Sequence, residues 1–220
     1  LSNITAGSYQ VNVQDANNCL INSSIAVSNS SGPSATMSSI SNVLCSGGNN
    51  GSATVNVTGG TAPFIYQWSN SPGNTPTISN LAAGNYSVTI TDANNCATGL
   101  QFSVTQPSAL SLQVSAIANL CSGANNGQIS VNVNGGIAAY TYSWQPGAST
   151  NSSLSGLYDG TYTVSVTDQN GCTAVSGNTV SSPSAISGSV INSSDVSCFG
   201  GNDGSATVIA NGGTSPYSYF

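Results

Sequence analysis

Two short cysteine motifs recur along this chain at a fixed spacing. In the first, a cysteine ends an Asn-rich hexapeptide such as TDANNC at 91–96, and its cysteines are Cys19, Cys96 and Cys172. The second has the form C-x-G-x-N-x-G, and its cysteines are Cys45, Cys121 and Cys198. Within each set neighbouring cysteines lie 76 or 77 residues apart, and the two sets include every cysteine. A fixed period of this size indicates tandem copies of one small domain.

Each copy begins at a proline, and this defines four parts of the chain. Residues 1–32 are the C-terminal part of a preceding repeat, 33–106 and 107–182 are complete repeats, and 183–220 are the N-terminal half of a following repeat. We therefore expect the chain to be a segment of a longer protein.

Within a repeat the apolar residues alternate with period two, which is typical of β-strands with one buried face. Ala53, Val55 and Val57 form one such set, and Ile129, Val131 and Val133 repeat it. Gly-Gly pairs at 59–60, 135–136 and 212–213 predict turns between strands. We found no helical pattern of useful length.

A tyrosine motif narrows the fold further. The pattern Leu-x-x-Gly-x-Tyr ends at Tyr86 and Tyr162, and it resembles the tyrosine corner of immunoglobulin-like sandwiches. Trp68 and Trp144 lie 18 residues earlier, where such sandwiches carry a core tryptophan. The sequence therefore predicts an all-β protein made of tandem immunoglobulin-like β-sandwich domains of about 76 residues each.

The charged side chains exclude several functions. The chain has six Asp or Glu residues, all of them Asp, and no Lys, Arg or His. Nucleic acid is excluded as a partner because no cation can neutralise phosphate. No basic residue can hold the chain on an anionic membrane, and no apolar run reaches the roughly 18 residues of a spanning helix, so we expect no membrane insertion. Without a His or Lys base or a repeated carboxylate pair, we expect no catalytic residues and no enzyme.

The alternating aromatic residues have two interpretations. Phe64, Tyr66 and Trp68 share one face of a predicted strand, as do Tyr140, Tyr142 and Trp144. They are either the domain core or a platform on which sugar rings stack. We favour the core, with Trp68, Trp144, Tyr86 and Tyr162 as its main members, because small sandwiches need buried aromatic area.

The recurring aspartates are the only weak candidates for a metal site. Asp92 and Asp168 each lie four residues before a cysteine, in an Asn-rich turn. A carboxylate at such a place usually accepts backbone N–H groups and fixes the turn. A Ca²⁺ ion needs six to eight oxygen ligands, which one Asp and its neighbours do not supply. We therefore expect no cofactor, with calcium at Asp92 and Asp168 as the open alternative.

The repeat allows two disulfide patterns. An even, repeated set of cysteines predicts oxidised pairs in an extracellular protein. Pairing within a repeat gives Cys45–Cys96 and Cys121–Cys172. In an immunoglobulin-like topology, however, the A–B and F–G turns lie at opposite ends, about 20 Å apart for a six-residue strand. A disulfide needs Cα atoms within about 7 Å, so we narrowly favour a bond between repeats, Cys45–Cys172.

The motifs together identify a family resemblance. The order is C-x-G-x-N-x-G followed by a strand, then a Gly-Gly turn and an aromatic strand that ends in Trp, then Leu-x-x-Gly-x-Tyr and Asp-x-Asn-x-Cys. This order resembles the SprB-type repeat of cell-surface and gliding adhesins of Bacteroidota, over essentially the whole chain.

The resemblance implies type IX secretion, a location at the cell surface and a role in adhesion or gliding. We therefore expect a structural or adhesive stalk, or a filament segment, whose partners are neighbouring repeats and surface polysaccharide. The alternatives are a carbohydrate-binding repeat array and an accessory region of an extracellular hydrolase.

Overall fold

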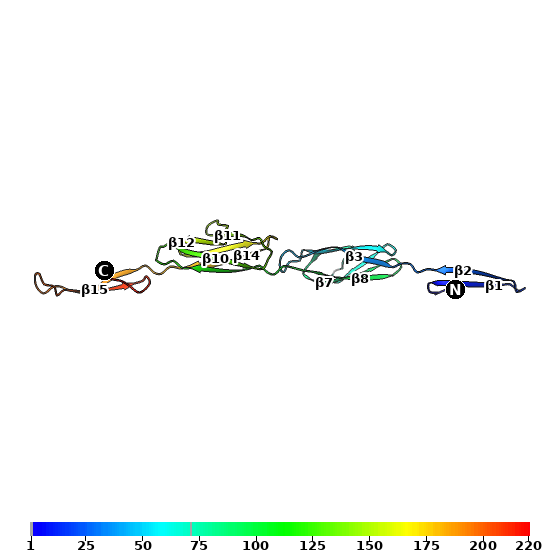
Figure 1. Ribbon diagram of the computed structural model, residues 1–220, viewed down its shortest axis with the longest axis horizontal. Helices are drawn as coiled ribbons and strands as arrows, with labels where there is room; N and C mark the ends of the chain where they lie inside the picture. Colours follow the sequence, from blue (N-terminus) through cyan, green and yellow to red (C-terminus); the bar gives the residue numbers. More distant parts are fainter. Residues whose placement is uncertain (1, 71) are drawn as a thin grey trace. The chain divides into compact units, whose positions relative to one another are not determined.

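The protein is built from strands alone in the part of the chain that the structure describes. The structure is a computed structural model, and it describes residues 2–70 and 72–220. In that part the sixteen regular elements are all β-strands, and no helix is long and apolar enough to cross a membrane. Figure 1 follows these strands along the chain.

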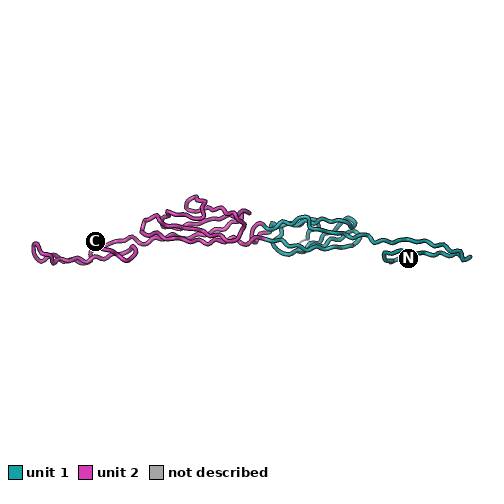
Figure 2. The backbone as a smooth tube through the Cα atoms, viewed as in Figure 1, with its two compact units in different colours: residues 1–43, 49–105 teal, residues 44–48, 106–220 magenta. Residues whose placement is uncertain are grey.

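The chain packs as two compact units (Figure 2). Unit 1 contains residues 1–43 and 49–105, and unit 2 contains residues 44–48 and 106–220. The boundary near residue 106 coincides with the start of a repeat. Residues 44–48 are the exception, because the sequence places them inside the first complete repeat whereas the structure places them in unit 2.

Unit 1 contains one complete sandwich and one separate hairpin. The hairpin pairs the first two strands in antiparallel register, and the sandwich has two three-stranded sheets with orders β3-β4-β6 and β5-β7-β8. The strands are β1 (Gly7–Gln14), β2 (Leu20–Val27), β3 (Pro33–Ser41), β4 (Gly51–Gly59), β5 (Ile65–Trp68), β6 (Thr77–Leu81), β7 (Gly84–Thr91) and β8 (Ala97–Val104).

Unit 2 repeats this arrangement, with its separate hairpin at the other end of the sequence. Its two sheets have orders β12-β10-β9 and β11-β13-β14, and its last two strands form an antiparallel hairpin. The strands are β9 (Ser111–Ile117), β10 (Gly127–Asn134), β11 (Thr141–Gln145), β12 (Ser153–Leu157), β13 (Gly160–Thr167), β14 (Thr173–Val180), β15 (Ser187–Ser194) and β16 (Ser205–Asn211).

Among the described residues each complete repeat thus has six strands in two sheets. One sheet holds the first, second and fourth strands and the other holds the third, fifth and sixth. This is the division of an immunoglobulin-like sandwich without its fourth strand, D. The predicted fold class is confirmed.

Alternation along the strands produces the two cores. In β10 every second residue is buried from Gly127 to Val131, and in β13 from Tyr162 to Val166. Trp144 is fully buried between these strands and their neighbours, and Trp68 holds the same place in unit 1. Residues on the opposite faces, such as Ile65 and Val175, are more than half exposed.

In the two complete repeats the last glycine of the C-x-G-x-N-x-G motif is required by close packing. Gly51 and Gly127 are the buried first residues of β4 and β10. A Cβ on Gly51 would lie 2.8 Å from both the Leu81 carbonyl oxygen and a Val104 methyl, and a Cβ on Gly127 would collide with Val180. A contact of 2.8 Å is far inside van der Waals distance, so only glycine lets the two sheets approach here.

The tyrosine corner is present in all three copies. The Tyr86 hydroxyl donates to the Ala82 carbonyl at 2.9 Å, and the Tyr162 hydroxyl donates to the Tyr158 carbonyl at 3.2 Å. Tyr9 makes the same bond to the Thr5 carbonyl at 2.6 Å. Each bond ties the turn before the fifth strand of its repeat to that strand, so the Leu-x-x-Gly-x-Tyr motif has a structural role.

Candidate functional site: the disulfide junction

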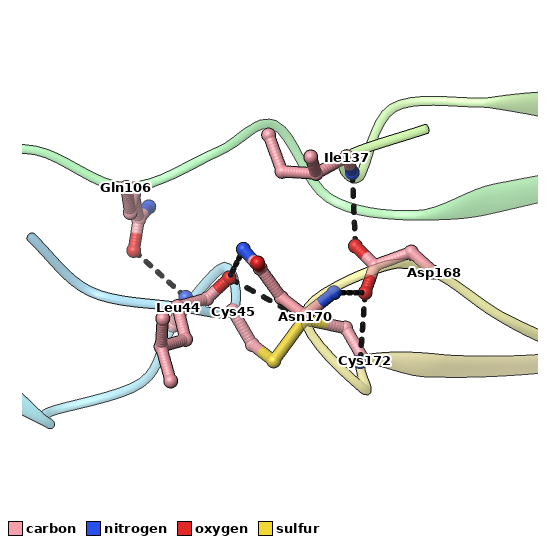
Figure 3. Close-up of a disulfide and its surroundings, with 8 residues drawn as sticks. Leu44, Cys45, Gln106, Ile137, Asp168, Asn170 and Cys172 are labelled. Atoms are coloured by element: carbon pink, nitrogen blue, oxygen red, sulfur yellow. Dashed lines mark hydrogen bonds between the residues drawn. A yellow bond between two sulfur atoms is a disulfide. The ribbon is translucent and has the colours of Figure 1, made fainter. Parts of the chain in front are cut away.

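A disulfide joins two repeats at the point where residues 44–48 enter unit 2 (Figure 3). It links Cys45, between β3 and β4, to Cys172, at the start of the last strand of the following repeat. Their Cα atoms are 5.7 Å apart, and 127 positions separate them in the sequence. The structure therefore contains the bond between repeats that was narrowly favoured from topology.

The intradomain pairs Cys45–Cys96 and Cys121–Cys172 are absent, because Cys45 and Cys172 bond to each other. Cys96 and Cys121 are free thiols, as are Cys19 and Cys198. Cys45 lies in the loop between the first and second strands of its repeat, and Cys96 lies in the turn between the fifth and sixth. The intradomain alternative was wrong for this topological reason.

The loop at Cys45 is held by hydrogen bonds as well as by the disulfide. Its own turn is closed by the Gly48 N–H, which donates to the Cys45 carbonyl at 3.0 Å. The Gly47 N–H donates to Oε1 of Gln106 at 2.8 Å, and Nδ2 of Asn170 donates to the Leu44 carbonyl at 2.9 Å. The loop is thus held by Gln106, the last residue of its own repeat, and by Asn170 of the next repeat, and both of these residues belong to unit 2.

The turn that carries Cys172 is organised by one buried carboxylate. Oδ1 of Asp168 accepts the N–H groups of Asn170 and Cys172, both at 2.9 Å, and Oδ2 accepts the N–H of Ile137 at 2.9 Å. The Asp168 residue is only 5% exposed. Because it binds both its own turn and the turn that follows β10, this carboxylate fixes the position from which Cys172 reaches Cys45.

Unit 1 has the same carboxylate arrangement without a disulfide. Oδ1 of Asp92 accepts the N–H groups of Asn94 and Cys96, both at 2.9 Å, and Oδ2 accepts the N–H of Thr61 at 3.1 Å. In the preceding repeat Oδ1 of Asp15 accepts from Asn17 and Cys19, both at 2.8 Å. The turn geometry therefore belongs to the repeat and does not depend on the bond.

These hydrogen bonds lower the pKa of both buried carboxyl groups. For Asp168 the hydrogen bond from the Ile137 N–H is the largest cause of the lower pKa. Burial raises the pKa, whereas the N–H groups of Cys172 and Asn170 lower it further. Burial is the largest single influence on Asp92 and raises its pKa, but the N–H groups of Cys96, Thr61 and Asn94 together outweigh it. Both groups are therefore held as carboxylates at neutral pH.

Acid should weaken unit 2 through Asp168. Its pKa is lower in the folded state than in the unfolded chain, so its contribution is fully present above the ordinary carboxyl pKa of about 3.9. That contribution should decline as pH falls below this value and vanish below the folded-state pKa. In Asp168→Asn the amide cannot accept all three N–H groups, so unit 2 should be less stable than in the parent at pH 7. The variant should also lose less stability than the parent does when the pH falls from 4 to 2.

Urea unfolding at several pH values, followed by fluorescence of Trp144, measures this effect. Asp159→Asn is the matched control, because Asp159 is exposed and lies in the same repeat. Identical pH profiles for Asp168→Asn and the parent would show that Asp168 does not stabilise the turn.

The aromatic residues lie in the cores and form no exposed platform. Trp68 is 4% exposed and Trp144 is fully buried, and Tyr162 is buried while Tyr86 is half-buried. The indole N–H of Trp68 donates to the Thr75 carbonyl at 2.9 Å, and that of Trp144 donates to the Asn151 carbonyl at 2.8 Å. Both indoles are thus satisfied inside the sandwich and cannot offer a face to a sugar ring.

The described residues contain no group of three or more His, Cys, Asp or Glu side chains placed to hold a metal ion. At the calcium candidates Asp92 and Asp168, each carboxylate oxygen accepts at least one backbone N–H group. A calcium ion at either carboxylate would therefore share oxygen atoms that already accept hydrogen bonds.

An open groove of about 550 Å³ lies on unit 1, where β7 and β8 meet residues 69 and 70. Its lining is mostly hydroxyl and amide groups, including Ser69, Asn85 and Gln101, and Tyr86 and Phe102 also contribute. In unit 2 the residues paired at these strand positions are Gly177 and Asn178 in place of Gln101 and Phe102. The lining of this groove therefore differs between the two complete repeats.

Two hydrogen bonds at the junction were missed from the sequence. Gln106 binds the Gly47 N–H within the first complete repeat, and Asn170 of the second binds the Leu44 carbonyl, yet no motif predicts either long-range partner. A usable signal existed for Asn170, because asparagine recurs two residues before each cysteine of the first motif, at positions 17, 94 and 170.

Comparison with protein families gives one match. The model of the family described as SprB repeat matches residues 37–73, 119–149 and 190–219. Each match includes the C-x-G-x-N-x-G motif and the Gly-Gly turn that follows it. No curated protein matches the chain.

Among solved structures the chain is similar to several multidomain proteins. The N-terminal eight immunoglobulin domains of Down syndrome cell adhesion molecule match with 12% identity and a TM-score of 0.43, over 80% of this chain and 28% of that one. A C-terminal fragment of intimin, solved with its receptor's intimin-binding domain, matches with 14% identity and a TM-score of 0.37, over 73% and 67%. The ectodomain of mouse nectin-like molecule 4 matches with 12% identity and a TM-score of 0.32, over 71% and 66%. This chain thus spans less than a third of the first of these structures.

Proposed function

This chain carries SprB repeats, and we propose that it is a stalk segment of a secreted cell-surface adhesin, in which repeated sandwiches carry a binding region away from the cell. The observation that carries the proposal is the junction, where a loop of one repeat is hydrogen-bonded and disulfide-bonded to the next. Such a connection limits bending and separation of neighbouring repeats, which a stalk under load requires.

The chemistry of the repeat supports a mechanical role. The turn aspartate and the corner tyrosine recur in the three copies that include these positions, and in each copy they make the same hydrogen bonds within the turn. The lining of the groove on unit 1 is not kept in unit 2, where Gly177 and Asn178 replace Gln101 and Phe102, so the groove gives no support to an array of identical carbohydrate sites.

A disulfide of this kind also supports an extracellular location, because structural disulfides persist in oxidising compartments. We further propose export by type IX secretion and a role in adhesion or gliding, with neighbouring repeats and surface polysaccharide as partners. These proposals rest on the family.

Solution scattering tests the stalk. We expect the maximum dimension of proteins with two, three and four repeats to grow by a constant increment per repeat. In the Cys45→Ser/Cys172→Ser double variant we expect the same increment with a broader distribution of distances, because the junction is no longer covalent. A maximum dimension that stays constant as repeats are added would contradict the stalk.

A further inference from the structure

The loop at Cys121 is built like the loop at Cys45, although its cysteine is free. Its turn is closed by the Ala124 N–H, which donates to the Cys121 carbonyl at 3.2 Å, as the Gly48 N–H does to Cys45. The Leu120 N–H is held by Oδ1 of Asn126 at 3.1 Å. Cys121 is exposed, whereas Cys45 is half-buried against its neighbours. The loop is therefore folded in its docking shape and presents its thiol to solvent.

A cavity of about 420 Å³ lies beside this thiol. It is lined by Leu120, Cys121 and Ser122 on one side and by residues 183–186, Gly213 and Thr214 on the other. Leu120 is 74% exposed and Ile186 is 67% exposed. The lining thus joins a loop of one repeat to the start of the next, as the bonded junction does.

The cavity lining matches the bonded junction position by position. The Gly213 N–H donates to the Ser184 carbonyl at 2.8 Å, and in the bonded junction the Gly136 N–H donates to the Ser108 carbonyl at 2.9 Å. Thr214 follows Gly213 as Ile137 follows Gly136, and the Ile137 N–H is the group that binds Oδ2 of Asp168. The lining around Gly213 therefore corresponds to the surface on which the Asp168 turn rests.

The partner that fits this surface is preformed in every copy of the repeat. The turns at Asp15, Asp92 and Asp168 all use one carboxylate oxygen to bind the N–H of the cysteine four residues later, at 2.8 to 2.9 Å. An Asp-x-Asn-x-Cys turn therefore presents its cysteine in the same way whether or not that cysteine is bonded. Both sides of the junction exist before the bond forms.

We propose that the cavity at Cys121 receives the Asp-x-Asn-x-Cys turn of the SprB repeat that begins at Pro183 in the same polypeptide, and that Cys121 forms a disulfide with the cysteine of that turn. The loop cysteine of each repeat then bonds to the turn cysteine of the next. By the same rule Cys96 and Cys19 are turn cysteines that bond to the loops of the repeats before them, and Cys198 bonds to the turn of the repeat after it.

The chemistry is an ordinary thiol–disulfide exchange. The Cys121 thiolate attacks a small disulfide such as oxidised glutathione and releases one glutathione thiolate. The turn cysteine then attacks the mixed disulfide and releases the second. Two protein thiols are oxidised and one glutathione disulfide is reduced, and the two protons that the protein thiols lose are taken up by the two glutathione thiolates. This bonding rule stands apart from the adhesive role, which can fail without affecting it.

A chain extended by a copy of residues 144–182 after Phe220 tests the proposal. Phe220 corresponds to Ser143, so the extension completes the last repeat and supplies a turn with its cysteine. After oxidation with glutathione, alkylation and chymotrypsin digestion, we expect one peptide in which Cys121 is linked to the added cysteine. Three alkylated cysteines should remain, which are Cys19, Cys96 and Cys198.

Two comparisons make the result decisive. In the 220-residue chain we expect four alkylated cysteines, including Cys121, and in the extended Cys121→Ser variant the added cysteine should be alkylated. The Cys45–Cys172 link in the same digest reports that the junction has folded. The proposal is overturned if that link forms while Cys121 is alkylated, or if the added cysteine bonds to Cys198 of its own repeat.

Discussion

Replacing Trp144 with alanine is expected to lower the free energy of unfolding of unit 2 by about 3–5 kcal/mol, the usual cost of removing a large aromatic side chain from a core. Trp144 is fully buried, and its indole N–H satisfies the Asn151 carbonyl. Its loss leaves both a cavity and an unpaired carbonyl. Chemical denaturation followed by circular dichroism measures the change.

The chain provides its own controls for this substitution. Val175→Ala removes an apolar side chain that is 66% exposed on β14, and it should change stability by less than about 0.5 kcal/mol. Trp68 is the only other tryptophan and lies in unit 1, so its fluorescence should report a transition close to that of the parent. A Trp144→Ala protein as stable as the parent would show that the indole is not part of the core.

Removing the disulfide is expected to cost unit 2 about 2–4 kcal/mol. The bond closes a loop over a sequence separation of 127, for which the chain-entropy relation gives about 5 kcal/mol. We expect the smaller value because residues 49–105 of unit 1 lie within this loop, and while they stay folded they reduce the chain freedom that the bond removes. Cys172→Ser in a Trp68→Phe background, followed by Trp144 fluorescence during urea unfolding, isolates the effect in unit 2.

Cys121→Ser in the same background is the matched control. It removes a thiol that is free in this chain, so the stability of unit 2 should not change. A reducing agent added to the parent should reproduce the Cys172→Ser result. Equal losses from Cys121→Ser and Cys172→Ser would mean that the missing sulfur, and not the bond, causes the effect.

Strands and cores could be predicted from the sequence because their signals are local and are repeated. The alternation of apolar residues around Val55 and Val131 predicted which strand faces are buried. The motif that ends at Tyr86 and Tyr162 predicted the tyrosine corner. Repetition strengthened each interpretation, since the same pattern had to fit one fold in both repeats. The hydrogen bonds of the turn aspartates followed from the same local reasoning.

The junction could be predicted only in part, because it depends on contacts between residues far apart in the sequence. Topology favoured Cys45–Cys172 over the intradomain pairs, but no local pattern places Leu44 beside Asn170. Asn119 is a second example. It is buried where the first repeat has Val43, and its Oδ1 accepts the Gly127 N–H, but its Nδ2 has no partner among the described residues.

The bond between Cys45 and Cys172 also decides what a protease can do to this protein. Any single peptide bond cut between residues 46 and 171 lies inside the closed loop, so both products stay covalently attached. The exposed segment at 147–153 is such a place, and a nick there leaves one molecule until the disulfide is reduced. Trypsin has no site at all, because the chain lacks Lys and Arg. Release of a fragment from this region therefore requires either two cleavages of the chain or reduction of the disulfide.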